Sequence, residues 1–182
     1  RLPEIASIVT EIESRLEEPG QGALTGLHAL VSAGPTREPL DPVRYLSNHS
    51  SGRQGYAIAG ALAAQGARVT LVSGPVSLAA PRGVTLVKVE TGRQMLKACE
   101  GALPADVFIS VAAVADWRPA RAATKKLKIK GAGSEAPSME LAENPDILKT
   151  LSNKRKNRPR LVIGFAAETH DLEDYARAKL DR

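Results

Sequence analysis

Apolar residues along the chain fall into two alternating patterns. Short runs of consecutive apolar and often β-branched residues predict buried strands at 27–33, 68–73, 84–89, 106–114 and 160–167. Between them, stretches with helical spacing or helix start and stop residues predict helices at 52–65, 91–103, 144–154 and 171–180. Nearly continuous apolar strands separated by helices are typical of a parallel sheet covered on both faces. We therefore expect an α/β fold with a doubly wound, mostly parallel sheet.

The N-terminal segment stands apart from that alternation. Over residues 2–17, isoleucine, valine and leucine recur at helical spacing, and the following segment 18–22 contains the proline and glycines that end a helix. We interpret residues 1–26 as a helical arm and linker from a preceding domain. Residues 27–182 then form the main domain.

Composition narrows the class of protein. The sequence contains no apolar run of the roughly 18 residues that a membrane span needs, and its N-terminus lacks the pattern of a signal peptide. Cys99 is the single cysteine, so an internal disulfide is excluded, and we expect a buried thiol in a cytoplasmic protein. The net charge of +5 is compatible with nucleic-acid binding, but aromatic residues make up only 3%. Phosphate-bearing small ligands explain that charge at least as well.

Ligands of such sheets bind beyond the carboxyl ends of the strands, so the segments that follow the strands hold the candidate residues. The first segment, after Ala33, is stiffened by prolines and carries Arg44 and Asn48. It leads into Ser50-Ser51-Gly52-Arg53-Gln54-Gly55, directly before a predicted helix. Small residues at a helix N-terminus expose backbone N–H groups, which favours a phosphate site about as much as an ordinary helix cap.

Two further segments follow later strands. Ala113 and Asp116 belong to the sequence AAVADWRP, where a carboxylate at a strand end suits Mg²⁺ beside phosphates, or else caps a helix. Phe165 lies in GFAAET and is expected either to face a nucleotide base or to fill the core. Histidines are scattered without metal-ligand spacing.

Lysines alternate with apolar residues in the sequence KKLKIK at 125–130. That period of two predicts an extended flap with one apolar face and one cationic face, the latter carrying Lys126 and Lys128. Such a flap can close over a nucleotide triphosphate, although a solvated charge run is the simpler interpretation.

Taken together, six segments resemble the phosphopantothenate–cysteine ligase family in order and spacing. They are AGPTREPLDPVRYLSNHSSGRQG at 33–55, VTLVSGP at 69–75, VAAVADWRP at 111–119, KLKIK at 126–130, ENPDIL at 143–148 and GFAAET at 164–169. The form resembled is the C-terminal half of a bacterial bifunctional flavoprotein. The resemblance implies a Rossmann-like sheet, and it makes residues 1–26 the join to a decarboxylase half that alone would bind FMN.

The resemblance further implies a CTP-dependent ligation in coenzyme A biosynthesis. In the first step a carboxylate oxygen of 4′-phosphopantothenate attacks the α-phosphorus of CTP, so that pyrophosphate leaves and an acyl cytidylate forms. In the second step the amine of cysteine displaces CMP from the acyl carbon and forms the amide. Positioning and charge neutralisation should dominate such a reaction, because anions must be brought together.

Carried over residue by residue, the resemblance assigns roles to the candidates. Lys126 is expected to serve formation of the acyl cytidylate and Asn48 its onward reaction, with the Asn48 amide donating to the oxyanion. Arg44 is expected to reach a substrate phosphate and Ala113 to line the substrate site. The expected nucleotide-binding residues are Ser50, Gly52, Gly55, Asp116 (with Mg²⁺), Lys126, Lys128 and Phe165.

The resemblance also implies a homodimer of the ligase domain, a higher oligomer of the longer protein, and no membrane or nucleic-acid partner. Members of the family continue into further sheet after the last helix, so we expect the domain's C-terminal part to be missing here.

Two interpretations from other classes remain. A Rossmann oxidoreductase using NAD(P) is suggested by the parallel sheet and by Tyr175 and Lys179 one helical turn apart. About fifteen residues separate the first strand from the glycines, however, which is a poor match to a dinucleotide fingerprint. A non-catalytic basic module is suggested by the net charge of +5 and the lysine run.

Overall fold

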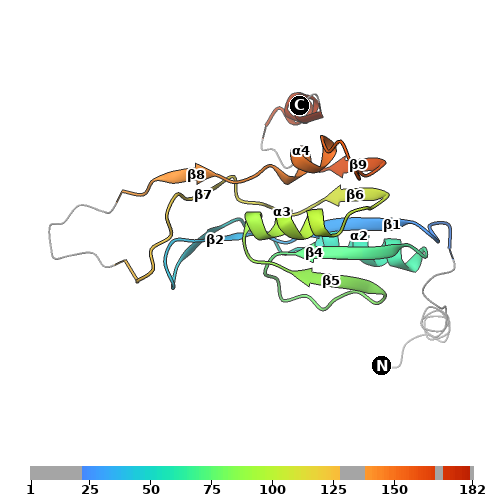
Figure 1. Ribbon diagram of the computed structural model, residues 1–182, viewed down its shortest axis with the longest axis horizontal. Coiled ribbons are helices and arrows are strands. Elements are labelled where there is room, and N and C mark those ends of the chain that lie inside the picture. The colour runs from blue at the N-terminus through green and yellow to red at the C-terminus, as the bar shows by residue number, and fades with distance from the viewer. Residues whose placement is uncertain (1–21, 128–137, 167–169, 181–182) are drawn as a thin grey trace.

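A computed structural model describes residues 22–127, 138–166 and 170–180. The helix predicted at 2–17 lies outside this range. A five-stranded sheet of parallel strands forms the centre of the molecule (Figure 1). From one edge to the other its strands are β5 (Val84–Lys88), β4 (Arg68–Ser73), β1 (His28–Ala33), β6 (Val107–Ser110) and β9 (Leu161–Gly164).

The strand order places a switch in chain direction at the middle of the sheet. The chain starts at β1, proceeds outward through β4 to β5, and then returns to β6 on the other side of β1 before reaching β9. This is the Rossmann order, and the predicted α/β fold is confirmed. In such sheets the crevice outside the carboxyl ends of the two strands at the switch, here β1 and β6, is the usual ligand site.

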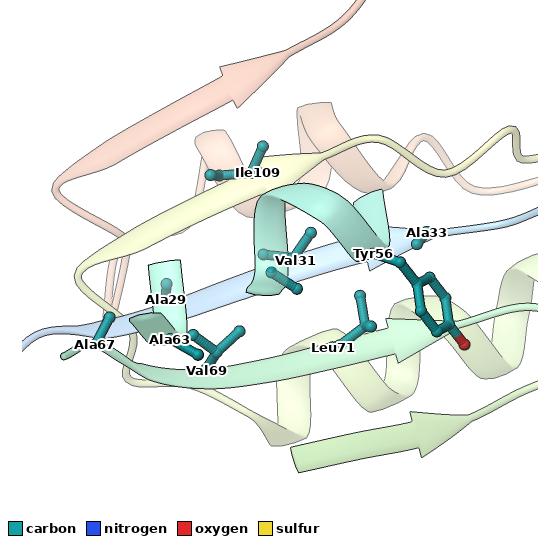
Figure 2. Close-up of a cluster of buried hydrophobic side chains, with 10 residues drawn as sticks. Ala29, Val31, Ala33, Tyr56, Ala63, Ala67, Val69, Leu71 and Ile109 are labelled. Carbon is teal, nitrogen blue, oxygen red and sulfur yellow. The ribbon is translucent and has the colours of Figure 1, made fainter. Parts of the chain in front are cut away.

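One face of the sheet is covered by α2 (Arg53–Ala64). Alternate residues of β1 and β4 point toward it, because successive side chains of a strand face opposite ways. Together with small residues of the helix they form a buried cluster (Figure 2), which includes Ala29, Val31, Tyr56, Ala59, Ala63, Val69, Leu71 and Ile109. The alanines of α2 allow the helix to approach the sheet closely.

The other face packs against α3 (Gly92–Gly101) and α4 (Ile147–Ser152). Its cluster comprises the intervening strand residues and two helix faces, with Leu30, Val72, Met95, Cys99, Phe108, Ile147 and Leu151. Cys99 is fully buried, as the sequence predicted, and burial raises the pKa of its thiol to about 12 with a smaller contribution from Glu100. Helices on both faces thus confirm the doubly wound architecture.

Two small antiparallel pairs lie beyond the carboxyl ends of the central strands (Figure 1). One joins β2 (Arg37–Pro39) to β3 (Tyr45–Ser47), and the other joins β7 (Trp117–Pro119) to β8 (Leu141–Glu143). The sequence predicted neither pair and treated residues 34–48 as a loop. α5 (Leu172–Leu180) is the last element, and no helix in the described ranges is long and apolar enough to cross a membrane.

Some predicted bounds are wrong. The strand predicted at 106–114 ends at Ser110, where pairing with β9 also ends; beyond it Val111 donates to the Ser32 carbonyl of β1 and Ala113 to the Gly34 carbonyl. The helix predicted from Asn144 begins at Ile147, since Asp146 is its N-cap and accepts the Lys149 N–H at 2.9 Å. β9 likewise ends at Gly164 within the predicted strand.

Candidate functional site

The segments that follow β1 and β6 are bonded to each other. The Ala113 N–H donates to the Gly34 carbonyl at 2.9 Å, and the Thr36 N–H donates to the Ala113 carbonyl at 3.3 Å. The buried Thr36 hydroxyl accepts the Ala115 N–H at 3.0 Å. These bonds fix the floor of the crevice at the switch between β1 and β6.

Glycines bring the N-terminus of α2 against this floor. Gly34 and Gly52 both have φ of +74°, a backbone conformation that favours glycine. A Cβ on Gly55 would lie 2.5 Å from Cβ of Ala33, the last residue of β1. Gly52 is the N-cap of α2 and makes no side-chain cap hydrogen bond. The predicted Ser50–Gly55 segment therefore lies at the carboxyl end of β1, where helix N–H groups favour an anion.

A cavity of about 480 Å³ opens beyond the carboxyl ends of β6 and β9. Its walls come from the segment after β6, the start of α4 and the segment after β9. The lining residues are Ser110, Ala112, Val114, Ala115, Asp116, Trp117, Glu143, Asn144, Pro145, Asp146, Ile147, Leu148 and Phe165. Exposed Phe165 and Trp117 offer apolar ring surface, so the alternative in which Phe165 fills the core is excluded.

The charged groups of the cavity are carboxylates. Asp116, Glu143 and Asp146 line it, and its described lining includes no lysine or arginine. No group of three or more His, Cys, Asp or Glu side chains in the described ranges is arranged to hold a metal ion by itself. Mg²⁺ is usually bound by only one or two carboxylates together with substrate phosphates. The donor set at Asp116 therefore fits Mg²⁺ that arrives with a phosphorylated ligand.

Asn48 joins the two sides of the site. Its Nδ2 donates to the Val114 carbonyl at 3.2 Å and lies 3.4 Å from the Ala113 carbonyl oxygen. The side chain therefore spans from the segment before α2 to the rim of the cavity. Because both contacts use the amide nitrogen, donation to an oxyanion would require one of these bonds to be exchanged.

Asn144 is the cavity residue with an unsatisfied group. Its Nδ2 donates to the Ala115 carbonyl at 2.8 Å, whereas its Oδ1 is buried and has no hydrogen-bond partner among the described residues. Leaving a buried acceptor without a donor costs about 1–3 kcal/mol. A local shift or a ligand that supplied a donor at this wall would recover part of that free energy.

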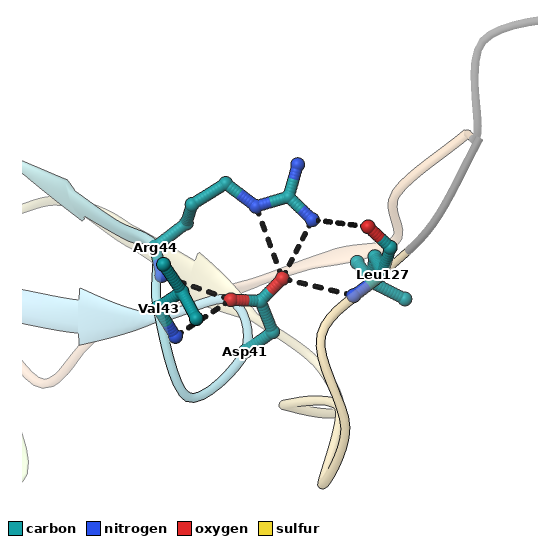
Figure 3. A network of polar contacts seen from close by, with 4 residues as sticks. All are labelled: Asp41, Val43, Arg44 and Leu127. Carbon is teal, nitrogen blue, oxygen red and sulfur yellow. Dashed lines mark hydrogen bonds and ion pairs between the residues drawn. The ribbon is translucent and has the colours of Figure 1, made fainter.

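Arg44 and Lys126 lie on the hairpin side of the site, outside the cavity lining. The Arg44 guanidinium pairs with Asp41 at 2.6 Å and donates to the Leu127 carbonyl at 2.8 Å (Figure 3). Arg44 and the backbone N–H groups around Asp41 hold the pKa of that carboxyl well below its usual range. Lys126 is exposed beside Leu127, and Lys128 lies outside the described residues.

The structure thus brings part of the predicted set together. Asp116 and Phe165 share the cavity, while Asn48 and Ala113 lie at its rim and Gly52 and Gly55 lie one layer away against β1. The chain leaves the cavity wall through β7 and then reaches the predicted flap at 125–130. The described part of that flap, residues 125–127, contains no strand.

Sequence reasoning missed several residues of the site. Asn144 and Asp146 belong to the predicted helix start and to the resembling segment ENPDIL, but they are not among the predicted site residues. Asp41 is not among the predicted site residues, although aspartate is typical of turns because its side chain bonds the backbone about two residues further on. Glu38, buried and accepting the Gly92 N–H at 2.8 Å, ties β2 to the N-terminus of α3.

Tyr175, the residue behind the oxidoreductase interpretation, lies on α5. Its hydroxyl is 3.5 Å from Nε2 of His170, and the two rings meet edge to face. Tyr175 is outside the described lining of the cavity. The geometry gives that interpretation no support.

Comparisons with known proteins agree with this fold. The model of a family described as the DNA/pantothenate metabolism flavoprotein C-terminal domain matches residues 24–182. The coenzyme A biosynthesis bifunctional protein CoaBC of Vibrio parahaemolyticus is 51% identical over 158 residues, 86% of this chain and 39% of that protein. The Escherichia coli K12 protein of the same name is 48% identical over 157 residues, 86% of this chain and 38% of that protein.

A solved structure shows the same fold. The crystal structure of the C-terminal domain of a CoaBC protein matches with a TM-score of 0.75 and 45% sequence identity, covering 88% of this chain and 74% of that chain. The chain spans about two fifths of the length of the curated relatives it matches. From the match over residues 24–182, the chain belongs to the DNA/pantothenate metabolism flavoprotein C-terminal domain family.

Proposed function

We propose that this domain joins 4′-phosphopantothenate to cysteine, using CTP and passing through an acyl cytidylate. The observation that carries the proposal is the cavity at the carboxyl ends of β6 and β9, in a sheet of Rossmann order, with Asn48 bonded to its rim. Support comes from relatives named for coenzyme A biosynthesis and from a Cab2 mutant, solved with phosphopantothenate-cysteine, that shares this fold.

In this proposal the nucleotide occupies the cavity, with its base against the exposed ring of Phe165. The triphosphate extends toward the N-terminus of α2 and the segment of Ser50, Gly52 and Gly55. There the Gly52 N–H donates to the Ser50 hydroxyl at 3.4 Å, a bond that a phosphate oxygen would replace. Three carboxylates would repel a triphosphate, so a cation is needed between them. Mg²⁺ held by Asp116 supplies that neutralisation when bound.

Lys126 provides the positive charge that the described cavity lining lacks. In the first step it would stabilise charge on the α-phosphate while the carboxylate oxygen attacks and pyrophosphate leaves. In the second step the Asn48 amide would leave one of its two carbonyl partners and donate to the oxyanion instead. It would thereby orient the acyl group while the amine of cysteine displaces CMP. Arg44 would bind a substrate phosphate through Nη1, while Nε and Nη2 keep their bonds to Asp41 and Leu127.

A second copy of the chain is the partner we propose. Five large apolar side chains on or next to the two small hairpins are exposed by 41–62%, namely Val43, Tyr45, Trp117, Met139 and Leu141. Apolar surface gathered in one region marks an interface. Sedimentation should detect a dimer that the substitution Val43→Asp weakens, whereas a monomer at micromolar concentration would contradict this assignment.

The proposed reaction is tested by pyrophosphate release and by mass spectrometry of the product. The protein in its full-length form should release pyrophosphate only when CTP, Mg²⁺ and 4′-phosphopantothenate are present together, and form the amide when cysteine is added. Binding measurements with CTP, ATP and NADPH should favour CTP. Absence of pyrophosphate under these conditions, or preferential binding of NADPH, would overturn the proposal.

Substitutions separate the two steps. Lys126→Gln should abolish formation of the acyl cytidylate, and Lys125→Gln, which removes a neighbouring exposed lysine, is the matched control. Asn48→Asp should allow the acyl cytidylate to form and accumulate. If both site variants turned over as fast as the unsubstituted protein, the assigned roles would be wrong.

A further inference from the structure

The turn between β2 and β3 is built around one buried carboxylate. Oδ1 of Asp41 accepts the backbone N–H groups of Val43 at 2.8 Å and of Arg44 at 2.9 Å. This is the aspartate-centred turn that a short acidic side chain stabilises. Oδ2 accepts from the Arg44 side chain, from Nε at 3.0 Å and from Nη2 at 2.6 Å.

The same pair also holds a segment far away in the sequence. Oδ2 of Asp41 accepts the Leu127 N–H at 3.1 Å, and Nη2 of Arg44 donates to the Leu127 carbonyl at 2.8 Å (Figure 3). Both backbone polar groups of Leu127 are therefore engaged. Upstream, the Ala123 N–H donates to the Leu40 carbonyl at 2.9 Å. The turn thus holds the segment between β7 and β8 by hydrogen bonds at two points, Ala123 and Leu127.

The position of these bonds matters because of what lies beside them. The Leu127 N–H belongs to the peptide group that joins Leu127 to Lys126. That group is planar, so fixing its N–H fixes the Cα of Lys126 as well. The Lys126 side chain itself is exposed and is left to swing from this fixed point.

We propose that Asp41, acting with Arg44, is a positioning residue that places Lys126 for the first step of the reaction. The inference rests on the proposed function, since it concerns the lysine assigned to acyl-cytidylate formation. Without the bonds from Asp41 and Arg44 to Leu127, the backbone at Lys126 would sample many positions. The effective concentration of the lysine at the α-phosphate would then fall. The Asp41 side chain is fully buried, so it acts through Leu127 and does not touch the substrate.

The test uses Asp41→Asn in the full-length protein. The amide keeps an oxygen for the turn but loses the charge that pairs with Arg44, and its NH₂ group opposes the Leu127 N–H. We expect pyrophosphate release in a single turnover to slow by 10- to 100-fold, because misplacing a reacting group by about 1 Å costs up to about 100-fold. The Kd for CTP should change by less than threefold. Asp106→Asn is the matched control, since Asp106 also accepts a backbone N–H, that of His28 at 2.9 Å, at the opposite end of the sheet.

A second readout does not depend on catalysis. Trypsin cleaves the Lys126–Leu127 peptide bond, whose nitrogen carries the hydrogen bonded to Asp41. Cleavage at that bond, followed by mass spectrometry, should be at least fivefold faster in Asp41→Asn than in the unsubstituted protein or in Asp106→Asn. Circular dichroism and the melting temperature show whether Asp41→Asn folds. If it does not fold, Arg44→Lys provides the same cleavage test, because lysine cannot bond Asp41 and Leu127 in the same two-pronged way.

The outcomes are distinguishable. If the unsubstituted protein and Lys126→Gln both release no pyrophosphate, the proposed function fails. If the unsubstituted protein is active and Asp41→Asn keeps its rate, or if cleavage is unchanged, the positioning role is refuted. A lower KM for 4′-phosphopantothenate at an unchanged kcat would also refute it, because Asp41 would then merely restrain Arg44 from binding phosphate.

Discussion

The substitution Gly55→Ala tests whether the contact between α2 and β1 limits the site. Gly55 lies in the first turn of α2, and a Cβ there would be 2.5 Å from Cβ of Ala33. Favourable carbon–carbon contacts have separations of about 3.5–4.0 Å, so the helix start would have to move by about 1 Å. We therefore expect Gly55→Ala to destabilise the domain, although alanine is the better helix former.

The magnitude follows from two opposing effects. Forcing an extra methyl group into a packed contact costs about 1–3 kcal/mol, and replacing glycine by alanine inside a helix returns about 0.5–1 kcal/mol. The net loss should be about 1–2 kcal/mol, or a decrease in Tm of about 2–8 °C for a domain of this size. CTP binding should weaken in parallel, since the N–H groups of α2 move with the helix.

Other glycines calibrate the result. Gly101 has no atom within 4 Å of its ideal Cβ, Gly60 meets Cβ of Pro81 at 3.3 Å, and Gly74 meets the Pro35 carbonyl oxygen at 1.6 Å. Chemical unfolding of the four alanine variants should rank their free energies of unfolding in the order Gly101, Gly60, Gly55, Gly74, from most to least stable. If Gly55→Ala unfolded at the same denaturant concentration as Gly101→Ala, the packing argument would be refuted.

Three further predictions concern buried groups. Cys99, whose pKa is raised to about 12, should not react with a thiol reagent in the folded protein at pH 8 and should yield one thiol after denaturation. The stability that its protonated form provides is lost as pH rises from about 9 toward about 12. Free energies of unfolding at pH 8 and pH 10 will measure this loss. Phe108→Ala, at a fully buried position, should cost about 3–5 kcal/mol in urea unfolding, against less than about 1 kcal/mol for Leu161→Ala, where the side chain is 52% exposed. Glu38→Gln should lower the free energy of unfolding by about 1–2 kcal/mol, because a charged acceptor at the N-terminus of α3 is lost. An unchanged urea midpoint would show that the charge adds nothing to the hydrogen bond from the Gly92 N–H.

The centre of the sheet was predictable because β1 and most of β4 are buried on both faces. Runs such as LHALVSA and RVTLVS leave no polar face, and only a sheet covered by helices accommodates them. The two hairpins were not predictable, because each strand has only three residues and Pro39 and Pro119 break any alternating pattern. Proline at the edge of a small sheet is tolerated, but it removes the signal that sequence reasoning uses.

Only those features of the site that follow from the topology of the sheet were predictable. That polar residues after β1 and β6 would meet followed from the parallel order, and Asp116 and Asn48 do approach the same cavity rim. The Asp41 contact joins residues 86 positions apart, and the Asn144 contact to Ala115 spans 29. Such pairings depend on how irregular segments fold back, which no local pattern encodes.

The bonds that tie the segment after β1 to the segment after β6 have a consequence for engineering. Gly34, Thr36 and Asn48 on one side each bond residues 113–115 on the other. The conformation of each segment therefore depends on the other, and neither segment would keep it if it were grafted alone into another protein. If a library randomised only one segment, selection would act mainly on how well that segment bonds the unchanged one. The smallest transplantable unit of this site is the pair of segments, together with the glycines that let α2 rest on them.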